Sequence, residues 1–112
     1  MRITTRQIND VTILDPNGKL TIGAGDIALR QALSEALFAG ARNLLVNMAG
    51  VTMIDSSGIG ELVSGYTTTV NYGGHLKLCS LPPRVSDILQ ITQLITVFEV
   101  FDSEQEAIES FA

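Results

Sequence analysis

The residue types that could carry chemistry gather in one short segment of this chain of 112 residues, between Asp55 and Glu61. Two adjacent hydroxyls, Ser56 and Ser57, follow a carboxylate there and precede the apolar periodicity of a helix. At a helix N-terminus a phosphate meets free N–H groups and the positive end of the helix dipole. Because it also adds about −1.5 to −2 charge, it would expel a partner docked on the segment. The spacing therefore predicts a phosphorylation-controlled switch.

The same segment also has an ordinary structural explanation. Asp and Ser are common helix caps and Gly is common in tight turns, so capping would explain either serine, although not both. We interpret Gly58 and Gly60 as positions that a partner backbone can approach closely. Ile59 and Glu61 would add one apolar and one acidic contact. The predicted partner-binding residues are Asp55, Ser56, Ser57, Gly58, Ile59, Gly60 and Glu61.

A catalytic serine would need a base beside it, and the sequence places none there. The chain has one histidine, His75. A predicted helix of about 16 residues, rising about 1.5 Å per residue, puts it roughly 24 Å from the serines. The local sequence also departs from the Gly-x-Ser-x-Gly pattern of hydrolases. We therefore predict that His75 begins a strand at the surface and that the protein is not an enzyme.

Cofactor and metal sites are equally unpromising. The segment Gly23–Ala28 matches a loose Gly-x-Gly-x-x-Ala dinucleotide fingerprint. However, Asp26 would place a carboxylate where the pyrophosphate binds, and no acidic residue follows the next strand to hold a ribose. The only cysteine, Cys79, lies in an apolar strand and should be an inert, buried thiol. With one cysteine and one histidine available, we predict neither a cofactor nor a metal.

Composition and charge limit the class of protein further. With 46% hydrophobic residues, the chain can bury one core, and its length suits one domain over residues 1–112. The net charge of −5 opposes binding to nucleic acid or to a membrane surface. No apolar run approaches the roughly 20 residues of a spanning helix, and the N-terminus lacks the pattern of a signal peptide. We predict a cytoplasmic monomer.

An α/β domain with a mixed sheet should position the switch segment. Residues 2–8 and 11–15 read as a hairpin, and Pro16-Asn17-Gly18 should break its second strand before an extended piece at 19–22. Asp26 is the expected N-cap of a first helix that ends at Gly40. The later elements are a buried strand at 43–48, a helix from the switch segment to Val70, a strand at 75–80, a helix after Pro82-Pro83, a strand at 97–101 and a helix opened by a capping box at Ser103–Glu106.

These elements amount to about five strands or extended pieces and four helices. An opening hairpin followed by alternating helices and strands predicts a sheet that is antiparallel at one edge and parallel through its middle, with helices covering it.

Essentially the whole chain resembles the STAS-domain anti-sigma-factor antagonists, which include small bacterial proteins of sporulation and stress control. The resemblance rests on the hairpin, the helix and strand that follow it, the Asp55–Gly60 turn and the return at Gly73–Leu76. It implies a STAS fold and a regulator that is not an enzyme. Family members are substrates of an ATP-using serine kinase that is also an anti-sigma factor. The unphosphorylated form binds this kinase and releases the sigma factor, phosphorylation reverses the switch, and a phosphatase resets it.

Carried onto this chain, the resemblance makes Ser56 the phosphoacceptor. Ser57 becomes a neighbouring cap or a secondary acceptor, Asp55 the residue that orients the turn, and Gly58 its obligate small residue. Mg²⁺ and ATP would belong to the kinase. Where many sporulation-type relatives carry Gly-Glu-Leu-Asp, this chain has Gly18-Lys19-Leu20-Thr21. Such a charge change alters complementarity and implies a different kinase.

The residues leave two alternative functions open. STAS domains also serve as non-phosphorylated scaffolds or as transporter-associated modules, in which case the turn is only an interaction surface and Ser56 only a cap. An enzyme would require a titratable pair in one pocket. A phosphate on Ser56 distinguishes the antagonist from the scaffold.

Overall fold

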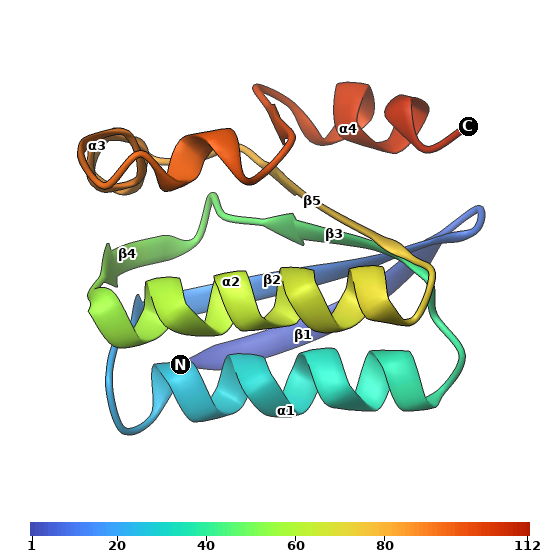
Figure 1. Cartoon of the computed structure of the whole chain (residues 1–112), viewed down its shortest axis with the longest axis horizontal. Coiled ribbons are helices and arrows are strands. Elements are labelled where there is room, and N and C mark those ends of the chain that lie inside the picture. The colour runs from blue at the N-terminus through green and yellow to red at the C-terminus, as the bar shows by residue number, and fades with distance from the viewer.

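Six strands form one mixed sheet in the computed structural model, which describes residues 1–112 (Figure 1). The strand order is β1-β2-β3-β5-β6, and β4 pairs with β2. In chain order the elements are β1 (Arg2–Ile8), β2 (Val11–Leu20), α1 (Gly25–Phe38), β3 (Asn43–Asn47), β4 (Val51–Ile54), α2 (Ser56–Asn71), β5 (His75–Cys79), α3 (Pro83–Ile91), the 3-10 helix η1 (Leu94–Thr96), β6 (Val100–Phe101) and α4 (Glu104–Ser110). The β1–β2 pair is antiparallel and the other pairs are parallel, so the predicted α/β fold is confirmed.

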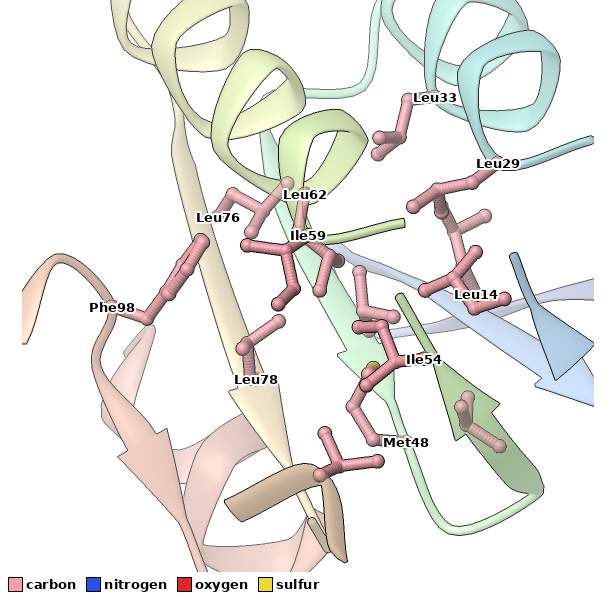
Figure 2. Packing of buried hydrophobic residues seen from close by; sticks show 14 of the residues in the cluster. Leu14, Leu29, Leu33, Met48, Ile54, Ile59, Leu62, Leu76, Leu78 and Phe98 are labelled. Carbon is pink, nitrogen blue, oxygen red and sulfur yellow. The ribbon is translucent and has the colours of Figure 1, made fainter. Parts of the chain in front are cut away.

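The core lies on both faces of the sheet, as the apolar run of β3 predicts. Leu44 and Val46 belong to a main cluster that also contains side chains of α1, α2 and α3 (Figure 2). Leu45, between them in the strand, belongs to a second cluster with Ala107 of α4. Figure 1 shows α1 and α2 running side by side in the same direction, so their first turns lie at the same end of the molecule. None of the helices combines the length and apolarity needed to cross a bilayer.

The predicted break of the second strand at Pro16–Gly18 is wrong, because β2 is continuous from Val11 to Leu20. Its first part pairs in parallel with β3 through Leu14, and its last part pairs with β4 from Gly18 onward. Pro16 lies between these two stretches, at a point where no parallel neighbour requires an N–H donor. Gly18 has a positive φ of +114°, which glycine adopts without strain, at the irregularity where β2 begins to pair with β4. The proline therefore marks an exchange of partner strands.

Three further boundaries differ from prediction. Strand β4 was not foreseen, and β6 is only two residues long, because residues 97–99 of the predicted strand lie between η1 and β6 and belong to neither element. The N-cap of α1 is Ala24, so the prediction of Asp26 is wrong. Asp26 lies in the first turn, where its Oδ1 accepts a hydrogen bond from the Gly23 N–H at 2.9 Å. The α4 cap is confirmed, since the Ser103 side chain accepts from the Glu106 N–H.

Candidate functional site

Asp55 joins the first turn of α2 to the loop between β2 and α1. It has extended backbone (φ −121°, ψ −175°) and is the N-cap of α2. One carboxylate oxygen accepts a hydrogen bond from the Gly58 N–H at 3.0 Å, and the other accepts from the Ile22 N–H at 3.0 Å. These bonds from Ile22 and Gly58 favour the charged form and hold the pKa of Asp55 below its ordinary value. The role in orienting the turn, which the resemblance implied, thus has a physical basis.

The stability of this junction should depend on pH with a defined sign. Because the folded pKa of Asp55 is depressed, its contribution is complete above the unfolded aspartate pKa of about 3.9 and is lost as pH falls through the lower folded value. We expect Asp55→Asn, which keeps an oxygen acceptor but cannot ionise, to unfold with a shallower dependence on pH below about 4 than the wild type. Thermal unfolding midpoints from pH 2 to 7 measure this, and identical pH profiles would contradict it.

Ser56 and Ser57 are the first two residues of α2, but they differ in exposure. Ser56 is exposed and Ser57 is half-buried. Because the Asp55 carboxylate supplies the cap, neither hydroxyl is needed for that purpose, and the capping role considered for Ser57 is filled. An exposed hydroxyl therefore lies on the N-terminal turn of α2, where the helix dipole favours a negative group.

The two glycines of the turn have different physical roles. A Cβ built on Gly58 would lie 2.1 Å from the Leu20 carbonyl oxygen and 2.9 Å from Leu20 Cγ, so this glycine allows α2 to pack against the end of β2. Gly58 is buried and is required by the protein's own packing. Gly60 is exposed, and nothing lies within 4 Å of a Cβ built on it. Of the two, Gly60 is the position that a partner backbone can reach.

Ile59 and Glu61, both predicted to contact a partner, interact instead with other parts of this chain. Ile59 is only 7% exposed and points from α2 into the main core, so the prediction of an apolar contact for a partner is wrong (Figure 2). Periodicity accounts for this, since Ile59 starts the inward face of the helix. The Glu61 carboxylate is paired with the Arg30 guanidinium of α1, 2.6 Å from Nη2. It presents an ion pair to the surface in place of a free acid.

Three exposed apolar side chains at this end of the molecule were missed by sequence reasoning. Ile22 is 73% exposed, and its N–H binds Asp55 directly. Met53 is two residues before Asp55 in β4, and Ile27 lies in the first turn of α1. We call Ile22, Ile27 and Met53 the apolar rim. Met53 could be recognised as outward-facing only by knowing that residues 51–54 form a strand, and Ile22 lies in the loop between β2 and α1, where no periodicity indicates which side chains are exposed.

The remaining candidates are His75, Cys79 and the glycine-rich segment before α1. His75 is exposed at the start of β5, the strand that follows the far end of α2, so the predicted surface position is confirmed. Cys79 is fully buried in β5, and this burial raises the pKa of its thiol. The glycine-rich segment before α1 has a packing explanation, because a Cβ on Gly25 would lie 2.3 Å from the Lys19 carbonyl oxygen. None of these three candidates therefore places a second reactive group beside Ser56.

Comparisons with known proteins agree on the fold. The sequence matches the STAS domain over residues 2–107. The TM1081 homolog of Thermotoga neapolitana, named as a candidate anti-sigma factor antagonist, is 31% identical over 102 residues, 91% of this chain and 90% of the relative. The crystal structure of TM1081 from Thermotoga maritima, given the same candidate role, is 27% identical with a TM-score of 0.89, covering 96% of this chain and 92% of that one.

A more distant structure has the same architecture. The phosphorylated form of the Bacillus cell fate determinant SpoIIAA is 20% identical with a TM-score of 0.76, covering 99% of this chain and all of that one. At this identity the likeness concerns the fold alone. The resemblance, which extended over essentially the whole chain, is confirmed by the match over residues 2–107 and by the relatives, and the chain belongs to the STAS domain family.

Proposed function

We propose that this protein is an anti-sigma-factor antagonist that acts as a phosphorylation-controlled partner switch, with Ser56 as the phosphoacceptor. The unphosphorylated protein binds an anti-sigma serine kinase through the α2 N-terminus and releases the sigma factor. The kinase supplies ATP and Mg²⁺, a phosphatase resets the switch, and the protein acts in the cytoplasm without enzymatic activity of its own. The observation that carries the proposal is the exposed Ser56 hydroxyl on a helix already capped by Asp55.

The surroundings of the two serines favour Ser56 over Ser57. Residues four apart lie on the same face of a helix, and like charges at that spacing are destabilising. Ser57 is followed at this spacing by Glu61, which is paired with Arg30, so a phosphate on Ser57 would compete with this carboxylate for the cation in a half-buried place. Ser56 is followed by Gly60, whose surroundings are open. A phosphate on Ser56 would lie beside the Asp55 carboxylate, but it would be exposed to solvent, would gain from the helix dipole and would leave the Glu61–Arg30 pair undisturbed.

The apolar rim explains how one phosphate could release a partner. The Ile22 N–H is hydrogen-bonded to Asp55, and Met53 lies two residues before Asp55 in the sequence. Both side chains are exposed and offer apolar surface to a docked protein. A phosphate introduced among these side chains would have to lose its hydration at the interface, which costs far more than it gains from the dipole. The exposed Lys19, at the end of β2 that leads into this loop, would contribute to the choice of kinase.

The comparisons support the proposal at the level of the family. SpoIIAA, which has this fold, is named in both an unphosphorylated and a phosphorylated form, so the fold tolerates the modification in that protein. The relatives with the higher identities are named for antagonism of an anti-sigma factor. The role proposed here is the same, with the α2 N-terminus as the point of contact.

Mass-spectrometric mapping tests the phosphoacceptor. The protein, Ser56→Ala and Ser57→Ala are each incubated with ATP, Mg²⁺ and lysate of the source cells. We expect one phosphate on Ser56 in the wild type and in Ser57→Ala, and none at this position in Ser56→Ala. Absence of phosphate from both serines, in a lysate that phosphorylates other proteins, would favour the non-phosphorylated scaffold.

Capture of the kinase tests the switch itself. We expect Ser56→Asp to bind the kinase at least about tenfold more weakly than Ser56→Ala, because a charge among apolar contacts costs about 1.4 kcal/mol or more. The measurement is affinity purification from lysate, followed by titration of the captured kinase against both variants. Equal affinity of the two variants would argue against a switch at Ser56.

A further inference from the structure

An exposed aromatic patch lies at the end of the molecule opposite Ser56. Phe38, the last residue of α1, is 95% exposed, and Tyr72, just after α2, is 56% exposed. The two helices run in the same direction, so their C-terminal ends lie at the same end of the molecule (Figure 1). The 16 residues of α2 separate this end from Ser56 by about 24 Å at about 1.5 Å per residue. The patch is therefore distinct from the proposed switch.

A groove lies beside the protruding Phe38. It has a volume of about 590 Å³ and is lined by both helix ends, including Leu37, Phe38, Arg42 and Tyr72. The Arg42 guanidinium lies 5.2 Å from the centre of the Tyr72 ring. Its Nη1 donates to the Leu37 and Ala41 carbonyl oxygens at 3.1 and 2.7 Å, which fixes the side chain. Nε and Nη2 remain available to an acceptor from outside the chain.

The groove also carries an acidic side chain that has no internal partner. Glu35 lines it, is exposed, and takes part in none of the four ion pairs of the structure. Arg42 likewise belongs to none of these pairs. The patch thus contains a projecting ring and a groove, and also an unpaired acid and a cation. The ring could fit such a groove, and the acid could pair with such a cation, on a second copy of the same surface.

We propose that this patch binds a second copy of the chain in a two-fold symmetric dimer. The Phe38 ring of each copy enters the groove of the other, and Glu35 of each copy pairs with Arg42 of the other. A two-fold axis repeats both contacts, so a surface that complements itself is satisfied completely by its own copy. A partner of one charge sign would leave either the acid or the cation unmatched. Aromatic and arginine side chains are also the residues that dominate interface centres.

This dimer goes beyond the proposed function and is compatible with it. Because the patch and Ser56 lie at opposite ends of α2, each copy would keep its switch exposed, and the dimer would present two switches to its surroundings. The patch is small compared with stable interfaces, so the dimer should be weak, with a dissociation constant of tens to hundreds of micromolar. Below such concentrations the chain would remain the monomer predicted from the sequence.

Sedimentation velocity over a range from micromolar to millimolar concentration tests the dimer. We expect the wild type to shift from monomer to dimer, and Phe38→Ala to weaken dimerisation at least tenfold. Phe38 is almost fully exposed, so its truncation leaves the core intact. Ile91→Ala, which truncates another side chain 81% exposed, is the matched control and should dimerise like the wild type. A wild type that stays monomeric to millimolar concentration overturns the proposal.

A charge exchange tests the pairing of Glu35 with Arg42. Glu35→Arg alone and Arg42→Glu alone each bring like charges together twice and should be monomeric. Mixed in equal amounts they restore both opposite-charge pairs, and we expect a one-to-one heterodimer. Thermal unfolding of each variant verifies its fold, and the Phe38→Ala comparison stands independently if Arg42→Glu is unstable. Failure of the folded variants to associate, or Phe38-dependent binding of a different protein by a monomeric chain, overturns the dimer and leaves the Ser56 switch untouched.

Discussion

Gly58→Ala is expected to lower the free energy of unfolding by about 3 kcal/mol or more, at or above the upper end of the usual range for overpacking. The added Cβ would lie 2.1 Å from the Leu20 carbonyl oxygen and 3.0 Å from Ile54 Cγ1. The first of these atoms belongs to the backbone of β2, which is held in the sheet and cannot rotate away as a side chain can. Relief requires α2 to move from the end of β2, which also disturbs the hydrogen bonds of Asp55.

Gly60→Ala is the matched control, two residues along the same helix. Nothing lies within 4 Å of its added Cβ. Because alanine is a better helix former than glycine, we expect this change to raise the free energy of unfolding by about 0.5 to 1 kcal/mol. Chemical denaturation of both variants measures the difference. Similar effects of the two substitutions would show that helix propensity, and not the contact with Leu20, decides the need for glycine.

Gly60→Ala also separates folding from the proposed recognition. If a partner backbone approaches the exposed Gly60, the added methyl group should weaken kinase capture although the variant is more stable than the wild type. Stability and capture would then change in opposite directions, which loss of structure cannot produce. Unchanged capture would show that the partner's backbone does not approach Gly60.

Elements with strong local signals were predictable from the sequence. The run Asn43–Met48 identified a strand covered on both faces, because only such a strand is apolar at successive positions. The start of α2 was placed by Asp55 and the apolar residues that follow it, and the start of α4 by Ser103. In each case the decisive interactions lie within a few residues of one another. Local chemistry was therefore sufficient for the fold class and for the position of the candidate site.

The errors concern interactions between residues that are far apart in the sequence. Pro16 suggested a break because the exchange of β2 from β3 to β4 depends on strands that come later in the chain. No strand was predicted over residues 51–54, which concealed the outward position of Met53. The unusual exposure of Ile22 and Phe38 was also unpredictable, since the sequence does not reveal which apolar residues the core leaves out. The binding surfaces therefore emerged only with the structure.

The burial of Lys77 is the same kind of long-range effect and supports the last prediction. Lys77 lies in β5 and is only 8% exposed because α4 covers it. Its ammonium donates to the Ser110 carbonyl oxygen at 3.2 Å and to Ser110 Oγ at 3.0 Å, and pairs with Glu99 at 3.2 Å. It also lies 4.5 Å from the centre of the Phe111 ring. Lys77 therefore fastens the C-terminal end of α4 to the sheet.

The other end of α4 is fastened separately. Glu104 accepts hydrogen bonds from Arg6 of β1 and from Asn47 of β3, the latter at 3.0 Å. The hydrogen bond from Arg6, and to a smaller extent that from Asn47, holds the pKa of Glu104 below its ordinary value. Because this helix has only seven residues, it has little intrinsic stability and depends on such contacts. Loss of the Lys77 contacts should therefore release the end of α4 before the rest of the domain unfolds.

We expect Lys77→Ala to lower the free energy of unfolding by about 3 kcal/mol, from lost hydrogen bonds to a charged group and the space left by the stem. Lys77→Met keeps most of the stem volume and should cost about half as much, roughly 1.5 kcal/mol. The exposed Lys19, changed to Met, is the control and should have an effect within about 0.5 kcal/mol. Hydrogen exchange should show faster exchange in α4 for both Lys77 variants. If Lys77→Met and Lys19→Met unfold alike, the ammonium contributes nothing, and packing of the stem alone holds α4 on the sheet.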